Sequence, residues 1–149
     1  MTRETEEQAR AESIVARMMA HDAFSRWLGI EVIAIRPRAC TLRMTVRADM
    51  VNGFGVSHGG VTYSLADSAL AFACNSDADG YVAMSIENTI AYPAAVNVGD
   101  ELVAVAEEES ATGRLGFYRV TVANQDGACV ALFTGTVYRT KRKHHTDTT

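Results

Sequence analysis

The chain has 149 residues, of which 48% are hydrophobic and 21% charged, and its formal net charge at pH 7 is −4. A single domain of this length buries about 68–70% of the surface of its unfolded chain, so its core needs no disulfide or metal for support. The negative charge argues against general nucleic-acid binding, and the chain is too short for a serine hydrolase fold.

Three cysteines, Cys40, Cys74 and Cys129, lie in apolar stretches and form no CxxC pair. This pattern predicts neither a disulfide framework nor a zinc site, and we expect no cofactor. His144 and His145 are adjacent on the C-terminal tail and lack the spacing of a metal site. There is no basic-then-apolar leader and no apolar run of the ~18–20 residues that cross a bilayer, so we expect no membrane partner and a cytoplasmic protein.

The N-terminal segment, residues 1–24, is expected to be helical. Residues 4–20 begin with acidic side chains, contain few helix breakers and present one apolar edge. Trp27 and Leu28 then predict a short turn or helix that is anchored in the core. Gly29 releases the chain into extended structure.

The side chains that follow alternate between apolar and polar. This pattern predicts a hairpin over residues 30–47 that turns at Pro37-Arg38. A glycine-containing loop covers residues 49–57, and an apolar helix over residues 60–76 comes next. Four further strands are predicted between turn-forming residues, at 81–93, 101–110, 115–124 and 128–140.

The order of helix, two strands, long apolar helix and four strands predicts an α+β fold, with one antiparallel sheet wrapped around one long central helix. The last three strands are joined by short turns, which is typical of an antiparallel meander. We assign the folded domain to residues 25–140. Residues 141–149 form a basic tail that we expect to be disordered.

Asp67 stands in the middle of the predicted apolar helix. Burial of a carboxylate costs free energy unless a partner uses it. No Lys, Arg or Glu occurs between Arg47 and Glu87, although a solvated helix face normally carries such side chains. Asp67 is therefore a candidate site residue. The alternative is a thin polar stripe facing water, formed with neighbours at helical spacing: Ser64, Ser68, Ala71 and Asn75.

The tetrapeptide Ser57-His58-Gly59-Gly60 comes immediately before this helix. Glycines let a ligand approach the backbone closely, and the first amide N–H groups of a helix have no partner within it. With the helix dipole behind them, these groups can bind an anion or stabilise the oxyanion that forms on a carbonyl under attack. A loop that only needs unusual dihedral angles is the alternative explanation.

Gly59 and Asp67 lie about 12 Å apart along one helix, too far to act together on one carbonyl and its attacking water. Two copies of the helix, antiparallel across a two-fold axis, bring Gly59 of one chain beside Asp67 of the other. We therefore expect a homodimer with two shared sites. Such a site suits a thioester, because a thiol with a pKa near ~8.5 leaves readily as thiolate. Asp67 then acts as a general base or as a nucleophile.

One spaced set of residues resembles the active-site segment of the hotdog-fold acyl-CoA thioesterases, in particular the phenylacetate-degradation branch: Asn52-x5-His58-Gly59-Gly60-x6-Asp67, followed by a strand with Ser85. The resemblance implies the hotdog fold, dimers with a continuous sheet, and tetramers built from two dimers. The activity it implies is hydrolysis of acyl-CoA, either aryl-acetyl esters such as phenylacetyl-CoA and its hydroxylated derivatives or medium-chain esters.

The resemblance also implies roles for individual residues. Gly59 donates its N–H to the thioester carbonyl, and Asp67 of the partner subunit is the catalytic carboxylate. Asn52 and His58 shape the site, and Ser85 holds a water molecule or the carboxylate. Asn52 can instead serve only the turn geometry of its loop. Ser85 can instead be a small residue on a wetter strand face that it shares with Ala83, Glu87 and Thr89.

Gly60 offers a second N–H group to the substrate. Positively charged side chains suited to the phosphates of CoA are Arg114, Arg139 and Lys141. Four apolar side chains line the acyl pocket or belong to the core: Phe54, Tyr63, Leu70 and Phe72. Two other functions fit the same fold, a hotdog enoyl-thioester hydratase or dehydratase and a non-catalytic sensor that binds acyl-CoA.

Overall fold

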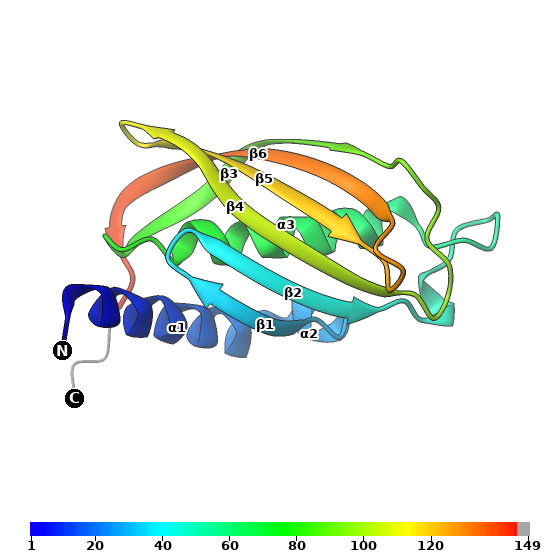
Figure 1. The fold of residues 1–149 in the computed structure, drawn as a ribbon, viewed down its shortest axis with the longest axis horizontal. Coiled ribbons are helices and arrows are strands. Elements are labelled where there is room, and N and C mark those ends of the chain that lie inside the picture. Colours follow the sequence, from blue (N-terminus) through cyan, green and yellow to red (C-terminus); the bar gives the residue numbers. More distant parts are fainter. Residues whose placement is uncertain (146–149) are drawn as a thin grey trace.

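The apolar stretch after His58 forms the helix at the centre of the fold. In the computed structural model, which describes residues 1–145, α3 (Gly59–Asn75) lies in the hollow of one curved antiparallel sheet (Figure 1). Its buried face alternates large side chains such as Leu70 and Phe72 with alanines, so the helix packs closely on the sheet. The sequence placed this helix within one residue of its observed ends.

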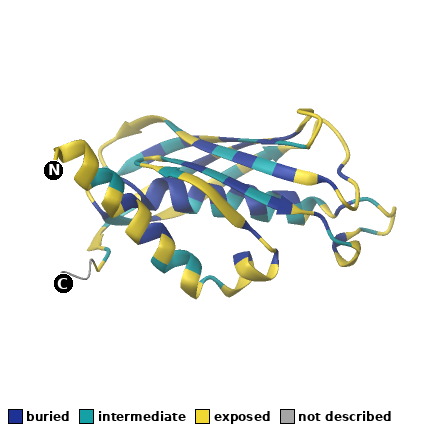
Figure 2. Ribbon diagram, turned by 60° about the horizontal axis from the view of Figure 1, so that its bottom comes forward, coloured by how far each residue is buried: buried dark blue, intermediate teal, exposed yellow. Residues whose placement is uncertain are grey.

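The sheet has six strands in the spatial order β1-β2-β4-β5-β6-β3, and all neighbouring strands are antiparallel. The strand bounds are β1 Glu31–Arg36, β2 Ala39–Thr45, β3 Tyr81–Ala91, β4 Glu101–Thr112, β5 Leu115–Ala123 and β6 Cys129–Lys143. Figure 2 shows buried residues alternating along the strands and gathered on α3. The predicted α+β architecture, with its hairpin and its meander of the last three strands, is confirmed.

The two edges of the sheet differ. At one edge, α1 (Arg3–His21) lies beside β1, and Gln8 Nε2 donates a hydrogen bond to the Ile35 carbonyl oxygen at 2.7 Å (Figure 1). A short helix, α2 (Ala23–Trp27), follows α1. At the other edge, the backbone of residues 84–91 pairs only with β6 among the residues that the structure describes. One edge is therefore covered and the other is open.

Trp27 differs from its prediction as a core residue, because its side chain is 56% exposed. The five-residue helix α2 turns this ring outward, where the Arg47 guanidinium lies 5.1 Å from the ring centroid and Phe24 stacks on the ring. The adjacent Leu28 fills the core instead and is 1% exposed. A prediction from size and apolarity alone therefore wrongly placed the larger of these two side chains in the core.

The C-terminal tail is also more ordered than predicted. Strand β6 continues to Lys143, which pairs with Tyr81 at the start of β3. His144 Nε2 lies 2.8 Å from the Oδ1 atom of the buried Asn75. The prediction of disorder is therefore wrong for residues 141–144, because pairing with β3 extends past residue 140; residues 146–149 lie outside the described part. Among residues 1–145, no helix is long and apolar enough to cross a bilayer.

The three cysteines are free, and they should differ in reactivity. Cys40 and Cys74 are buried, and burial raises the pKa of each thiol to about 12, whereas Cys129 is exposed. The thiolate is the reactive form. We expect an aromatic disulfide reagent at neutral pH to modify Cys129 alone in the folded protein and all three thiols in denaturant, as counted by mass spectrometry. Modification of more than one thiol in the native state would contradict the burial of the other two.

Candidate functional site

His58 begins α3 as its N-cap residue. Its Nδ1 atom accepts a hydrogen bond from the Gly60 N–H at 2.9 Å, and its carbonyl oxygen accepts one from the Val61 N–H at 2.9 Å. The imidazole thus takes the place of the usual Ser or Asp side chain at a helix start. The sequence analysis assigned the Gly60 N–H to the substrate, but this group already donates a hydrogen bond within the chain.

The N–H of Gly59 is different. We find no acceptor for it among residues 1–145, as expected for the first residue of a helix. The Tyr92 hydroxyl donates a hydrogen bond to the Gly59 carbonyl oxygen at 2.9 Å, and a Cβ atom at Gly59 would lie 3.2 Å from the Tyr92 ring. The lack of a side chain at Gly59 therefore leaves room for Tyr92. The free N–H lies at the positive end of the dipole of α3.

The loop before α3 gives Asn52 a structural role. Its Oδ1 atom accepts a hydrogen bond from the Phe54 N–H at 2.9 Å, and its carbonyl oxygen accepts one from the Gly55 N–H at 3.1 Å. These bonds match the alternative in which Asn52 serves the turn. Phe54 is 93% exposed at the tip, so in a single chain it lines no acyl pocket.

Residues 55–59 read Gly-Val-Ser-His-Gly, so the chain contains the letters of the GxSxG motif of serine hydrolases. That motif needs an exposed serine on a sharp strand-to-helix turn with a histidine base nearby. Here Ser57 is buried, and the His58 Nδ1 atom accepts from the Gly60 N–H. The geometry does not make Ser57 a nucleophile.

Asp67 is half-buried on α3, and its Oδ1 atom accepts a hydrogen bond from Asn88 Nδ2 at 3.2 Å. Burial raises the pKa of the Asp67 carboxyl, and the hydrogen bond from Asn88 opposes this rise. Ser68, the next residue of the predicted polar stripe, is covered by α2, because its hydroxyl lies 2.8 Å from the Ser25 hydroxyl. Asp67 is thus a partly enclosed carboxylate with one described partner.

A bulge in β3 corrects the predicted face of Ser85. The register with β6 shifts between Ser85 and Glu87, which breaks the alternation of side chains. Ser85 and Asn88 therefore lie on one side and hydrogen-bond to each other, while Glu87 and Thr89 line a shallow depression elsewhere on the sheet. Asn88 was missed because an unbroken strand was assumed; three consecutive polar residues between Ile86 and Ile90 were the available signal.

The predicted cationic residues are engaged to different degrees. Arg139 forms an ion pair with Asp77 at 3.0 Å, and the Asp77 side chain is only 4% exposed. Arg114 donates hydrogen bonds to the carbonyl oxygens of Arg139 and Thr140. Lys141 is exposed. The two arginines hold the end of the sheet together, and Lys141 alone of the three projects freely.

Of the predicted apolar pocket residues, Leu70 and Phe72 are core side chains with 0% exposure. Tyr63 is half-buried and packs edge-on against Phe133, with ring centroids 5.5 Å apart. Tyr63 lies one helical turn before Asp67 and so remains at the site. It is the one member of the predicted set that touches the candidate catalytic network.

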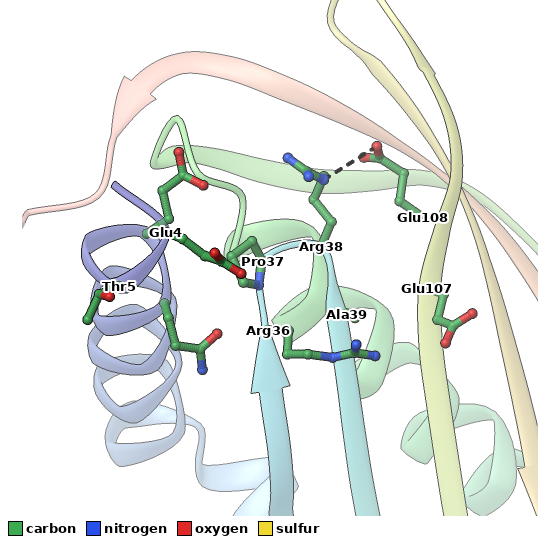
Figure 3. A pocket seen from close by; sticks show the side chains of 10 residues that line it. Glu4, Thr5, Arg36, Pro37, Arg38, Ala39, Glu107 and Glu108 are labelled. Atoms are coloured by element: carbon green, nitrogen blue, oxygen red, sulfur yellow. Dashed lines mark ion pairs between the residues drawn. The ribbon is translucent and has the colours of Figure 1, made fainter. Parts of the chain in front are cut away.

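Two of the larger depressions in residues 1–145 lie away from Gly59 and Asp67. One, of about 740 Å³, is charged and lies between the first turns of α1 and the β1–β2 turn, where Arg38 pairs with Glu108 (Figure 3). The other, of about 750 Å³, is an apolar groove between α1 and β1. Neither includes Gly59 or Asp67.

A single chain leaves Gly59 and Asp67 apart. They occupy the first and ninth positions of α3, which separates them by about 12 Å along the axis. Strand β3 runs alongside this helix, so that Asn88 meets Asp67, and Tyr92, the residue just after the strand, meets Gly59. The site thus consists of two half-sites along α3 and β3.

The chain belongs to the thioesterase superfamily. Residues 54–131 match the sequence model of the Thioesterase superfamily, a stretch that includes Gly59, Asp67 and all of α3. The central helix and its sheet also match solved hotdog structures.

Among its relatives is the acyl-coenzyme A thioesterase PaaI of Escherichia coli (strain K12), which is 38% identical over 122 residues, or 82% of this chain and 86% of that protein. The solved structure of the E. coli PaaI protein from the phenylacetic acid degradation operon matches with a TM-score of 0.87 and 34% identity, and the match covers 91% of this chain and 97% of that one. A solved protein of Thermus thermophilus matches with a TM-score of 0.76 and 38% identity over 80% of this chain and 99% of its own. The predicted family and hotdog fold are confirmed.

Proposed function

We propose that this chain hydrolyses acyl-CoA thioesters to a free acid and CoA in sites shared between two subunits. The main structural support is the Gly59 N–H, which has no partner within residues 1–145 and lies at the start of the helix that also bears the half-buried Asp67. Superfamily membership and the likeness to an acyl-coenzyme A thioesterase support this chemistry. Because a related structure comes from a phenylacetic acid degradation operon, phenylacetyl-CoA and its hydroxylated derivatives are the first candidate substrates, followed by medium-chain esters.

In this proposal the Gly59 N–H binds the thioester carbonyl oxygen. The negative charge that develops on this oxygen meets both the N–H and the positive end of α3. His58 and Tyr92 hold the first turn, because one caps the helix and the other binds the Gly59 carbonyl oxygen. They keep the donor oriented while the substrate changes charge.

Asp67 of the partner subunit supplies the carboxylate. As a base it takes a proton from the water that attacks the carbonyl carbon; as a nucleophile it forms a mixed anhydride that water then cleaves. In both cases the C–S bond breaks and CoA leaves as thiolate. A single turnover in ¹⁸O-labelled water detects an anhydride that water opens at the Asp67 carboxyl carbon, because the label then enters Asp67 and the first product stays unlabelled, whereas direct attack of water labels that product.

The open edge of β3 supports the dimer. An exposed edge strand is a site for pairing with another chain, and Met84 and Ile86 on it are 62% and 61% exposed. Antiparallel pairing of two β3 strands continues the sheet and sets two α3 helices antiparallel. A tetramer of two such dimers, with four times the 16.1 kDa chain mass, follows from the family resemblance, and light scattering would measure it.

Cationic and polar side chains make the remaining contacts of the proposed site. Lys141 and, on ligand binding, Arg114 and Arg139 face the CoA phosphates, while Ser85 acts on Asp67 through Asn88. Asn52 sets the loop that precedes the site. With all three cysteines free, we place the protein in the reducing cytoplasm.

Release of free thiol from a panel of acyl-CoA esters tests this function. Phenylacetyl-CoA and hexanoyl-CoA head the panel, with an enoyl-CoA included to detect hydration of the double bond. Thiol release from at least one saturated ester is expected. Hydration without thiol release would indicate the hydratase chemistry instead, and binding without any turnover would indicate a sensor.

Activity should fall on the acid side at a higher pH than for an exposed aspartate. Asp67 works only when ionised, and burial raises its pKa above the ordinary 3.8. The ionised fraction is therefore lost as the pH falls through this raised value. A profile of kcat/KM against pH measures the acid limb. A limb at or below the ordinary value would contradict the role of Asp67.

A further inference from the structure

Asn88 is the centre of a small polar network on Asp67. Its Nδ2 atom lies 3.2 Å from Asp67 Oδ1, 3.1 Å from the Tyr63 hydroxyl and 3.0 Å from the Ser85 hydroxyl. Because a carboxylate only accepts hydrogen bonds, the nitrogen of the amide must face Asp67. The hydrogen bond to the charged oxygen is the stronger kind.

The fold makes specific room for this amide. The bulge in β3 turns Asn88 toward α3, and Gly135 faces it across the pair of strands. A Cβ atom at Gly135 would lie 2.8 Å from Asn88 Oδ1 and 2.6 Å from Leu70 Cδ2. A side chain at 135 would therefore force Leu70 or the Asn88 amide to shift. The position of Asn88 is therefore set by the backbone of two strands.

Ser85 reaches Asp67 only through Asn88. Its hydroxyl bonds to the Asn88 amide, and within residues 1–145 the one hydrogen bond found for the Asp67 side chain is the bond to Asn88. One carboxylate oxygen is thus held, and the other is free to meet water or substrate. A held carboxylate presents this second oxygen in a fixed direction.

We infer that Asn88 is the positioning residue of the catalytic carboxylate: its amide holds Asp67 Oδ1 and aims the second oxygen. This inference rests on the proposed function for its catalytic meaning. The amide thus has the role of holding the carboxylate, which the family resemblance implied for Ser85. Ser85 and Tyr63 serve as the supports that fix the amide.

Asp67 is one of several titratable groups in this part of the molecule, and its charge acts on the Cys74 thiol together with those of Asp77 and Glu108. Tyr63 and Cys74 share α3 with it, and burial raises the pKa of the Cys74 thiol to about 12. Asp22, the N-cap residue of α2, is hydrogen-bonded to Ser25, whose hydroxyl meets that of Ser68. On β3 the site-facing residues Ser85 and Asn88 carry no charge, while Glu87 lies off this face. Among these carboxylates, Asp67 is the one to which Asn88 donates a hydrogen bond.

The test compares Asn88→Leu, which keeps the size and removes the donor, with Thr89→Val beside it, which leaves the network intact. We expect Asn88→Leu to lower kcat about 10- to 100-fold with little change in KM, as for a slightly misplaced catalytic group. The acid limb of its pH profile should move to higher pH, because the hydrogen bond from Asn88 no longer opposes the rise that burial causes in the pKa of Asp67. Thr89→Val should match the native enzyme in both.

A second variant and a second readout complete the test. Asn88→Asp keeps the side-chain shape and adds a like charge, so it should move the limb further in the same direction. Titration of the ¹³C-labelled Asp67 carboxyl by NMR follows the same pKa without any turnover, and so stands even if no thioester is cleaved. A native carboxyl pKa and a native acid limb in both folded variants would overturn the inference.

Discussion

Asp67→Asn is expected to lower kcat/KM for a good acyl-CoA substrate by at least ~100-fold, in the range for loss of a catalytic base. The new amide is nearly the same size as the carboxylate, and its oxygen can still accept the hydrogen bond from Asn88. It can neither take a proton from water nor attack the carbonyl. Thiol release at equal folded concentration measures the loss.

The matched control is Asp79→Asn, which neutralises an exposed carboxylate in the turn between α3 and β3. It changes the net charge by the same amount, so it corrects for long-range electrostatic effects on the anionic substrate. Asp79→Asn should keep native activity. If Asp67→Asn kept activity within a few-fold of native, Asp67 would be a structural residue and not the catalytic carboxylate.

Gly59→Pro is expected to lower kcat about 10²- to 10³-fold, the cost of removing one oxyanion donor. Proline lacks the N–H group and is favoured at the first position of a helix, where that group has no helical partner. The preceding His58 has extended backbone angles, φ −60° and ψ 134°, which the residue before proline prefers. The change therefore removes the donor while the helix start is kept.

Gly59→Ala separates the N–H group from simple crowding. The alanine keeps the donor and adds a Cβ atom 3.2 Å from the ring of Tyr92, a side chain that is 48% exposed and able to yield. We expect a much smaller loss of kcat than for the proline. Equal losses in the two variants would mean that space against Tyr92, and not the N–H group, is what Gly59 provides.

Local patterns predicted most of the fold. Alternation identified the strands, and the apolar stretch with His58 before it located α3 to within a residue. The place of β3 beside β6 has no local signature, because that pairing joins segments far apart in the chain. The exposure of Trp27 was missed for a related reason: it depends on how little of α2 the rest of the molecule covers.

The candidate site was predicted in part. Asp67 and Gly59 stand out because each is unusual in its local setting, a lone acid in an apolar helix and a glycine at a helix start. Asn88 and Tyr92 contact them only through the folding of β3 along α3. The bulge shifts the alternation of side chains along β3 by one residue and so turns Asn88 inward. A prediction that assumes strict alternation along the strand cannot include such a shift.

The sharing of each site between two chains is tested most directly by co-expressing Asp67→Asn and Gly59→Pro chains in equal amounts. Each chain carries one defect, so no site built from one chain alone is intact. Random pairing gives a site with both groups intact in about a quarter of cases, so we predict about a quarter of native activity. Activity no higher than the mean of the two variants prepared separately would contradict a site made from Gly59 of one subunit and Asp67 of its partner.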